Sequence, residues 1–340
     1  MPRFITHLGR TFAVAIMAFA LSACSGNGGT VSPAGPSIAN PAQSGAFNDT
    51  ASPAATGKIN HIVIIVQENR SFDNLFQGYP GADTQSYGYN SSGQKITLQP
   101  IGLESWWDIN HSSGAFFQAC DGTGSLPGTN CKMDGFNKEA CWGSNCPSNF
   151  QYSYVPHSET TPYFTMASQY VLADRMFASN FDASSFISHQ YIIGAQASSA
   201  VDYPNGAWGC DGGPSDVVAT VNAQRQIPSG YIQACFDNQT LGDELDKAGV
   251  SWAYYAATLS GDGSIWSAYQ AIRHIRYSKH WSKNIKSPQT RIFQDITNGV
   301  LPHVSWVTPT CENSDHAGCG SKTGPAWVAS VVNAVGTSKY

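Results

Sequence analysis

The chain has 340 residues, of which 12% are charged and 12% aromatic, and its formal net charge is −5. This length is enough for one large domain or two modest ones with a sizeable core. The acidic balance provides no basic surface and therefore excludes nucleic acid as a partner.

The first 24 residues have the organisation of an export signal. Arg3 and Arg10 supply positive charge, residues 12–21 form an apolar stretch, and Leu-Ser-Ala-Cys closes it at Cys24. The stretch is too short to span a bilayer, which is typical of a signal peptide. Its end resembles the lipobox of bacterial lipoproteins. The resemblance implies that Cys24 is lipidated and anchors the protein in the bacterial cell envelope, at the periplasm or outer membrane. The alternative is an ordinary secretory signal with a chance cysteine.

Residues 25–57 consist largely of Gly, Ser, Pro, Ala and Asn. Such a composition buries too little apolar surface to offset the entropy of ordering it, so we predict a disordered linker. The folded domain is then expected to cover residues 58–340.

Eight cysteines remain after Cys24. An even number in an exported chain favours disulfides, and the absence of CxxC spacing among them disfavours a thiolate zinc site. The sequence leaves the connectivity open. Pairing of sequence neighbours would join Cys120 to Cys131, Cys141 to Cys146, Cys210 to Cys235 and Cys311 to Cys319.

Strand and helix patterns alternate along the folded domain. Residues 61–66, a run rich in Ile and Val, predict a strand buried on both faces, and Ser71 is placed to cap a helix over 71–76. Residues 78–150 lack periodicity and predict elaborated loops. Further expected elements are helices over 162–177, 240–249 and 325–335, and strands over 250–255 and 304–307. The alternation predicts an α/β sandwich around a mostly parallel sheet flanked by helices.

The strongest local motif is Gln-Glu-Asn-Arg-Ser-Phe-Asp at 67–73, directly after the first predicted strand. Ligands of open α/β sheets gather at the carboxyl ends of the strands. The carboxylate of Glu68 beside the amide of Asn69 offers two hard oxygen ligands for a divalent cation. The alternative is that Glu68 pairs with Arg70 while Asn69 only turns the chain, and spacing alone does not decide between them.

Residues 58–73 closely resemble the opening of the bacterial phosphoesterase family that contains phospholipases C and certain acid phosphatases. The resemblance continues through residues 133–136, 170–177, 301–307, 314–316 and 327–335. It implies an alkaline-phosphatase-like fold, and it implies that Glu68 and Asn69 hold a divalent metal ion, whose identity stays open.

Residues 182–190, Asp-Ala-Ser-Ser-Phe-Ile-Ser-His-Gln, match the place where family members have a Ser or Thr nucleophile at the start of a helix. The resemblance assigns this role to Ser185, also as a ligand of the metal, with Ser184 as runner-up. A helix N-terminus favours both an alkoxide and a phosphate, and a bound cation would activate the hydroxyl. The alternative is that both serines only cap the helix.

The resemblance also implies that His111 and His316 hold the phosphate and the leaving oxygen, as imidazolium donors. His189 lies four residues after Ser185, on the same helix face. It could orient the hydroxyl, but a structural hydrogen bond is an equal alternative.

The chain departs from the family at one feature. The family's paired aspartates, which end a later strand and complete the metal site, have no counterpart, since no Asp-Asp pair occurs in the sequence. We therefore expect a truncated sequence with a fold incomplete at the C-terminus, weak metal binding and little turnover.

These observations predict a metal-dependent phosphoesterase that forms a phosphoserine intermediate, acting on either a phospholipid or a phosphomonoester. A second hypothesis is a catalytically impaired surface lipoprotein that uses the fold to bind a ligand. A serine carboxylesterase is disfavoured, because no Gly-x-Ser-x-Gly elbow surrounds Ser185.

Overall fold

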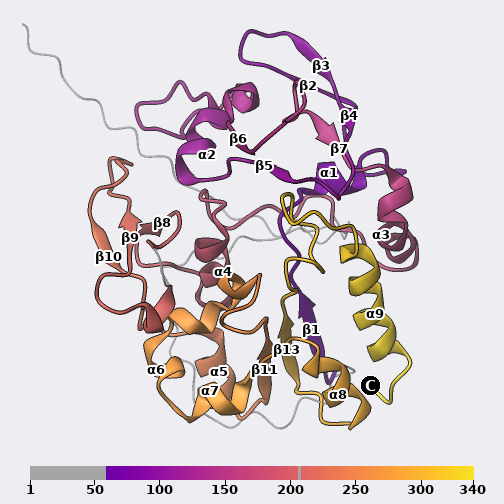
Figure 1. The fold of residues 1–340 in the computed structure, drawn as a ribbon, viewed down its shortest axis with the longest axis vertical. Coiled ribbons are helices and arrows are strands. Elements are labelled where there is room, and N and C mark those ends of the chain that lie inside the picture. Colours follow the sequence, from indigo (N-terminus) through magenta and orange to yellow (C-terminus); the bar gives the residue numbers. More distant parts are fainter. Residues whose placement is uncertain (1–58, 206–207) are drawn as a thin grey trace, which may run out of the picture. The chain divides into compact units, whose positions relative to one another are not determined.

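A parallel sheet lies at the centre of the fold in the computed structural model, which describes residues 59–205 and 208–340 (Figure 1). The predicted signal peptide, Cys24 and the predicted linker lie outside the described residues. In spatial order the sheet consists of β1 (Ile62–Ile65), β13 (Val304–Val307), β11 (Trp252–Tyr255) and β12 (Ile285–Lys286). Each strand runs parallel to its neighbour, so the carboxyl ends of all of them share one edge.

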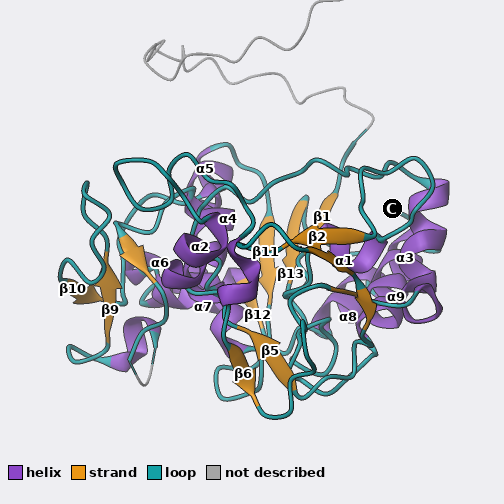
Figure 2. Cartoon of the chain, turned by 90° about the horizontal axis from the view of Figure 1, so that it is seen from above, coloured by secondary structure: helices purple, strands orange, loops and turns teal. Residues whose placement is uncertain are grey.

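Successive side chains of the sheet enter two separate cores, because neighbouring residues of a strand point to opposite faces. On one face Trp252, Tyr254 and Trp306 pack with the helix at 185–194, and the helices at 241–247, 273–276 and 279–284 complete that layer. On the other face Tyr255 and Val307 pack with the helices at 157–169, 291–297 and 324–336. Helices on both sides of the sheet are visible in Figure 2. The predicted α/β sandwich with a parallel central sheet is confirmed.

The helices are short, and their bounds follow. They are α1 (Phe72–Phe76), α2 (Ser113–Cys120), α3 (His157–Gln169), α4 (Ser185–Gly194), α5 (Leu241–Lys247), α6 (Arg273–Arg276), α7 (Lys279–Asn284), α8 (Arg291–Thr297) and α9 (Gly324–Gly336).

Small sheets and loops surround the sandwich. Their strands are β2 (Tyr87–Tyr89), β3 (Lys95–Thr97), β4 (Gln99–Pro100), β5 (Trp107–Ile109), β6 (Cys141–Gly143), β7 (Ser153–Tyr154), β8 (Ala200–Val201), β9 (Val217–Thr220) and β10 (Tyr231–Gln233). The predicted loop region 78–150 therefore contains short strands and also α2, whose 8 residues show weak apolar periodicity in the sequence.

Local capping explains why several predicted elements form where expected. The Ser71 side chain accepts from the Asn74 amide at the start of α1. Thr240 and Asp243 form a reciprocal capping box that starts α5. The strands at 252–255 and 304–307 and the helix α9 also match their predictions.

Two predictions about secondary structure are wrong. The first predicted strand, β1, is not buried on both faces. Among the described residues it pairs only with β13, so it lies at the edge of the sheet, and each of its residues is partly exposed. The predicted helix over 162–177 begins earlier and ends at Gln169. Tyr163 and Met166 pack into the core, but Tyr170 and Phe177 are exposed, so no buried contact supports further helical turns.

Within residues 59–205 and 208–340, all four disulfides join cysteines that are neighbours in the sequence. They are Cys120–Cys131, Cys141–Cys146, Cys210–Cys235 and Cys311–Cys319. The prediction of disulfides rather than thiolate metal ligands is confirmed. A search of the described helices finds none with the length and apolar character that a membrane span requires.

Candidate functional site

Two loops meet at the carboxyl edge of the central sheet. Glu68 and Asn69 follow β1, and the loop that carries His316 follows the adjacent strand β13. Because β1 and β13 are parallel neighbours, the segments that leave them emerge side by side. The sheet topology therefore brings residues more than two hundred positions apart into one place.

The buried carboxylate of Glu68 contacts two residues of α4. The Ser185 hydroxyl donates to Glu68 Oε2 over 2.6 Å, and His189 Nε2 lies 2.6 Å from Oε1. Ser185 is the first residue of α4 and His189 lies one turn later, so both side chains face the same way. Each oxygen of the carboxylate thus has a hydrogen-bonding partner.

The surroundings of Glu68 favour its charged form. Burial by itself would raise the pKa of Glu68, but the hydrogen bond and charge of His189 and the hydrogen bond of Ser185 outweigh burial and lower the pKa below its usual value. An unpaired buried carboxylate would be costly, so His189 stabilises the anion that faces Ser185.

His189 lies between Tyr254 and Glu68. Tyr254 donates its hydroxyl proton to the Trp266 carbonyl over 2.6 Å, so its oxygen is free to accept from His189 Nδ1, 3.2 Å away. On the other side of the ring, Nε2 lies against Glu68 Oε1. The polar partners of His189 are therefore Glu68 and Tyr254, not the Ser185 hydroxyl.

Tyr203 approaches Ser185 from the other side. Its hydroxyl accepts from the Ser185 backbone amide at 3.0 Å and donates to Ser185 Oγ at 3.2 Å. Burial raises the pKa of Tyr203, which keeps this hydroxyl protonated and able to donate. The Ser185 oxygen is consequently held between one donor, Tyr203, and one acceptor, Glu68.

Asn69 connects the same strand end to a second group of residues. Its Nδ2 donates to Asp108 Oδ2 over 2.9 Å, and its Oδ1 accepts a long contact of 3.4 Å from the Ala317 amide. Asp108 is in β5. Adjacent residues of one short segment thus reach in two directions, with Glu68 toward α4 and Asn69 toward β5.

His111 and His316 both lie next to Asp108. Their Nδ1 atoms are 3.7 Å and 3.8 Å from Asp108 Oδ2, and their rings are 6.2 Å apart. Each Nδ1 donates to a backbone carbonyl, that of Ile109 or of Ala317, which leaves Nε2 for another partner. The Nε2 of His111 is buried without a hydrogen-bond partner, so a ligand oxygen would satisfy it.

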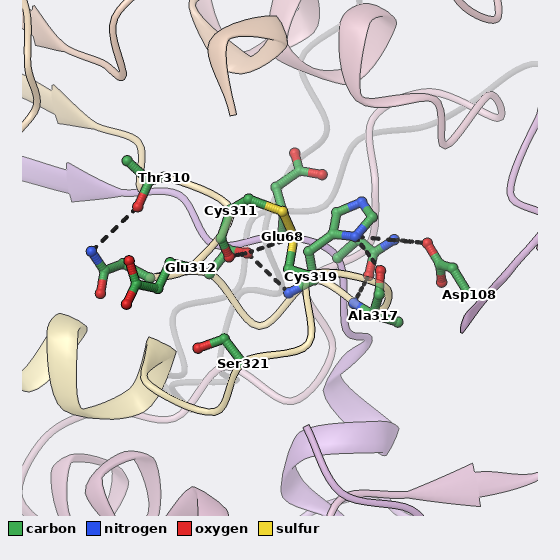
Figure 3. The surroundings of a disulfide bond; sticks show 12 residues. Glu68, Asp108, Thr310, Cys311, Glu312, Ala317, Cys319 and Ser321 are labelled. Atoms are coloured by element: carbon green, nitrogen blue, oxygen red, sulfur yellow. Dashed lines mark hydrogen bonds and ion pairs between the residues drawn. A yellow bond between two sulfur atoms is a disulfide. The ribbon is translucent and has the colours of Figure 1, made fainter. Parts of the chain in front are cut away.

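The loop that carries His316 is fixed at several points. Arg70 donates to the Asp315 carbonyl over 3.0 Å, and the hydroxyl of Tyr163 donates to Asp315 Oδ2 over 2.6 Å. The Cys311–Cys319 disulfide closes the loop on both sides of these residues, and Figure 3 draws it together with Glu68 and Asp108. His316 is therefore presented by a constrained loop.

The donor atoms agree with a divalent cation of the oxygen-binding class. Glu68 Oε2 and Ser185 Oγ are in contact, and the Asn69 oxygen makes only the long contact described above. Carboxylate, amide and hydroxyl oxygens suit Mg²⁺, Ca²⁺ or Mn²⁺.

Asp108, His111 and His316 form another group among the described residues whose possible ligand atoms lie within 4.8 Å of one another. The Nδ1 atoms of both histidines donate to backbone carbonyls, so their Nε2 atoms are the ones available to a ligand.

These contacts bear on two of the alternatives left open by the sequence. Arg70 binds the 315 carbonyl and Ser105 rather than Glu68. Ser184 occupies the N-cap position of α4 but makes no capping hydrogen bond with its side chain, so the interpretation of both serines as mere caps is wrong. The structure places Glu68, Ser185 and His189 in direct contact, and it places Asn69, His111 and His316 around Asp108.

Sequence reasoning missed Asp108, Tyr203 and Tyr254 as parts of the site. Asp108 lies three residues before His111, in the same Asp-Ile-Asn-His segment, and that spacing could have suggested it. The two tyrosines have no such signal, because they reach Ser185 and His189 from remote elements.

The fold and the site define a class: an α/β protein with a parallel sheet and a serine–carboxylate pair at its carboxyl edge. The model of the Phosphoesterase family matches residues 59–340, and the chain belongs to this family.

Two curated relatives resemble the chain at modest identity. The hemolytic phospholipase C of Pseudomonas aeruginosa is 23% identical over 313 residues, covering 82% of this chain and 40% of the relative. Phospholipase C B of Mycobacterium tuberculosis is 24% identical over 308 residues, covering 82% of this chain and 55% of the relative. The chain thus spans about half the length of the relatives it matches.

The buried carboxyl of Asp315 gives the loop a pH-dependent stability. Burial raises its pKa to about 6, although the Tyr163 hydrogen bond and the Arg70 charge oppose this. The folded state therefore binds the proton more tightly than the unfolded state, and this stabilisation is lost as pH rises through about 6. Replacing Asp315 with Asn should reduce the fall in the free energy of unfolding between pH 4.5 and 7.5 by about 2 kcal/mol.

Urea unfolding of both proteins at the two pH values measures this difference. The matched control is Glu312→Gln, which removes one negative charge at an exposed position of the same loop. An Asp315→Asn protein with the same pH dependence as the wild type would contradict the assignment.

Proposed function

We propose that this chain is a metal-dependent phosphoesterase in which Ser185 attacks phosphorus and forms a phosphoserine intermediate. The observation that carries the proposal is the buried Ser185 hydroxyl, which donates to the Glu68 carboxylate at the N-terminus of α4. The family membership and the names of the relatives agree with phosphate-ester chemistry.

The site's own residues supply the proton transfers. As Ser185 Oγ bonds to phosphorus, its proton passes along the existing hydrogen bond to Glu68 Oε2. Tyr203 remains hydrogen-bonded to Oγ and holds its orientation. The bond between phosphorus and the leaving oxygen breaks, and an imidazolium of His111 or His316 gives that oxygen a proton. Water then attacks phosphorus and gives a proton to the imidazole that was left neutral in the first step. The bond between phosphorus and Ser185 Oγ breaks, and Glu68 returns the proton to Oγ.

The partnerless Nε2 of His111 is the second supporting observation. A non-bridging oxygen of the phosphate would satisfy this buried nitrogen, and His316 would contact the same group from the neighbouring loop. Asp108 lies beside both rings and compensates the positive charge that they carry when protonated.

Glu68, Asn69 and Ser185 would hold the divalent ion. A bound cation there would offset negative charge on the phosphate and stabilise the serine alkoxide. We propose a phospholipid or a phosphomonoester as substrate, since both contain the same reacting group. The second candidate, a lipoprotein that binds phosphate esters without turnover, uses the same contacts and becomes an outcome of the first experiment below.

The sequence has no Asp-Asp pair, so we expect the wild type to hydrolyse p-nitrophenyl phosphate slowly. Replacing Ser185 with Ala should lower this rate at least a further hundredfold, because the nucleophile is removed. Ser184→Ala is the matched control, since the Ser184 hydroxyl is buried without a hydrogen-bond partner, and this variant should keep wild-type activity. Trapping of ³²P on the wild type, but not on Ser185→Ala, identifies the intermediate.

Undiminished activity of Ser185→Ala would move the nucleophile elsewhere. If the wild type binds inorganic phosphate but does not hydrolyse the ester, the binding-module candidate replaces the enzyme.

A divalent cation should raise the melting temperature of the wild type, because it binds only the folded site. Glu68→Gln keeps the size of the side chain but removes the charge, so the increase should disappear. Thermal unfolding with EDTA or with millimolar Mg²⁺, Mn²⁺ or Ca²⁺ measures it, and Glu312→Gln should respond like the wild type. A cation response of Glu68→Gln equal to that of the wild type would exclude Glu68 as a ligand.

We also propose that Cys24 is lipidated and attaches the protein to the cell envelope. In a bacterial host that processes lipoproteins, the wild type should partition into the detergent phase of Triton X-114, whereas Cys24→Ala should stay in the aqueous phase. Labelling with an alkyne palmitate checks the modification directly. Equal partitioning of the two proteins, with no label on either, would support an ordinary secretory signal.

A further inference from the structure

A pocket of about 340 Å³ lies against the histidine side of the site. Asp108 and His316 line it, together with Trp142 and the disulfide between Cys311 and Cys319. Neither Ser185 nor Glu68 belongs to its lining. The pocket therefore shares His316 with the proposed phosphate site and does not include the proposed nucleophile.

The chemistry of the lining is largely apolar. Asp108 and His316, which already belong to the site, are its only residues with ionisable side chains. The remaining surface comes from Trp142, the disulfide and small residues. With no Lys or Arg in the lining and a carboxylate at one side, the pocket disfavours a second anionic group and suits a neutral, flat, apolar one.

Trp142 is positioned toward the site by strand pairing. It lies in β6 directly opposite Asp108 of β5, and residues opposite each other in an antiparallel pair project from the same face. Its ring is 6.0 Å from the ring of His111 at an interplanar angle of 85°. A single exposed aromatic residue on a protein surface needs no explanation. Trp142, which is 54% exposed, differs because it lines a pocket and lies next to a histidine of the site.

In-line transfer relates this pocket to the reaction. The leaving group departs from phosphorus on the side opposite the attacking oxygen. With Ser185 Oγ on the Glu68 side and the histidines beyond the phosphate, the departing alcohol would point toward Asp108, His316 and the pocket.

We infer that this pocket is the leaving-group subsite and that its ligands are phosphate esters of aryl or similarly flat apolar alcohols, which pack on Trp142. The inference rests on the proposed function, because it takes the phosphate to lie between Ser185 and the histidines. Trp142 is then a specificity-determining residue.

Isothermal titration with two non-hydrolysable probes tests the subsite without requiring turnover. Phenylphosphonate and methylphosphonate present the same phosphonate group and differ in the part that would enter the pocket. The wild-type chain should bind phenylphosphonate about tenfold more tightly, the effect expected of a well-packed aromatic pair. In Trp142→Ala this preference should fall to about twofold or less, while the Kd of methylphosphonate stays unchanged.

Two further variants keep the test decisive. Trp142→Phe retains an aromatic ring and should retain most of the preference, which distinguishes lost stacking from a damaged fold. Tyr231→Ala removes an aromatic side chain of similar exposure, 59%, from the distant strand β10 and should behave like the wild type.

The outcomes separate this inference from the proposed function. If the wild type binds both phosphonates with equal affinity, the phosphate site stands and the subsite is overturned. If Trp142→Ala keeps the full preference, the subsite is also overturned. If the wild type binds neither probe, with or without a divalent cation, both the subsite and the phosphate-binding role of the site are overturned.

Discussion

The contact between the Glu68 carboxylate and the Ser185 hydroxyl is the interaction on which the site depends. It joins the end of β1 to the start of α4 across more than a hundred residues of sequence, over 2.6 Å. A carboxylate in this buried place is tolerable only with close donors, and Ser185 and His189 supply them from one face of a single helix. The Glu68 carboxylate accepts the hydrogen bond of Ser185 and holds the start of α4 in place. In return, α4 supplies the two donors that stabilise the buried carboxylate.

The segment after β1 connects two parts of the site, because its two adjacent side chains contact different partners. Glu68 contacts α4 and Asn69 contacts Asp108, so one short stretch of backbone positions both the serine side and the histidine side of the site. The loop after β13 contributes His316, and it is fixed by Arg70 and by the Cys311–Cys319 disulfide. Displacement of this backbone would move both halves of the site together.

Sequence reasoning succeeds here where the information is local and fails where it depends on remote partners. The strands at 252–255 and 304–307 and the capped helix at 241–247 follow from short-range patterns. The edge position of β1 does not follow from its sequence. A run of Ile and Val is typical both of strands with one neighbouring strand and of strands with two. Residue types suggested that Glu68 and Asn69 were ligands, but Ser185 emerged only through resemblance to a family. Tyr203 and Tyr254 could not be found at all, since nothing near them in the sequence records that they contact α4.

The site contains two adjoining groups of ionisable residues, one around Glu68 and one around Asp108. On one side the buried Glu68 carboxylate contacts His189, and on the other Asp108 faces two histidines whose Nδ1 atoms donate to backbone carbonyls. In the proposed mechanism the first arrangement accepts the serine proton, and the second gives a proton to the departing oxygen. Base and acid would then lie on opposite sides of the phosphate. A pocket that opens on the acid side alone, bordered by Trp142, is where an alcohol released by that transfer would lie.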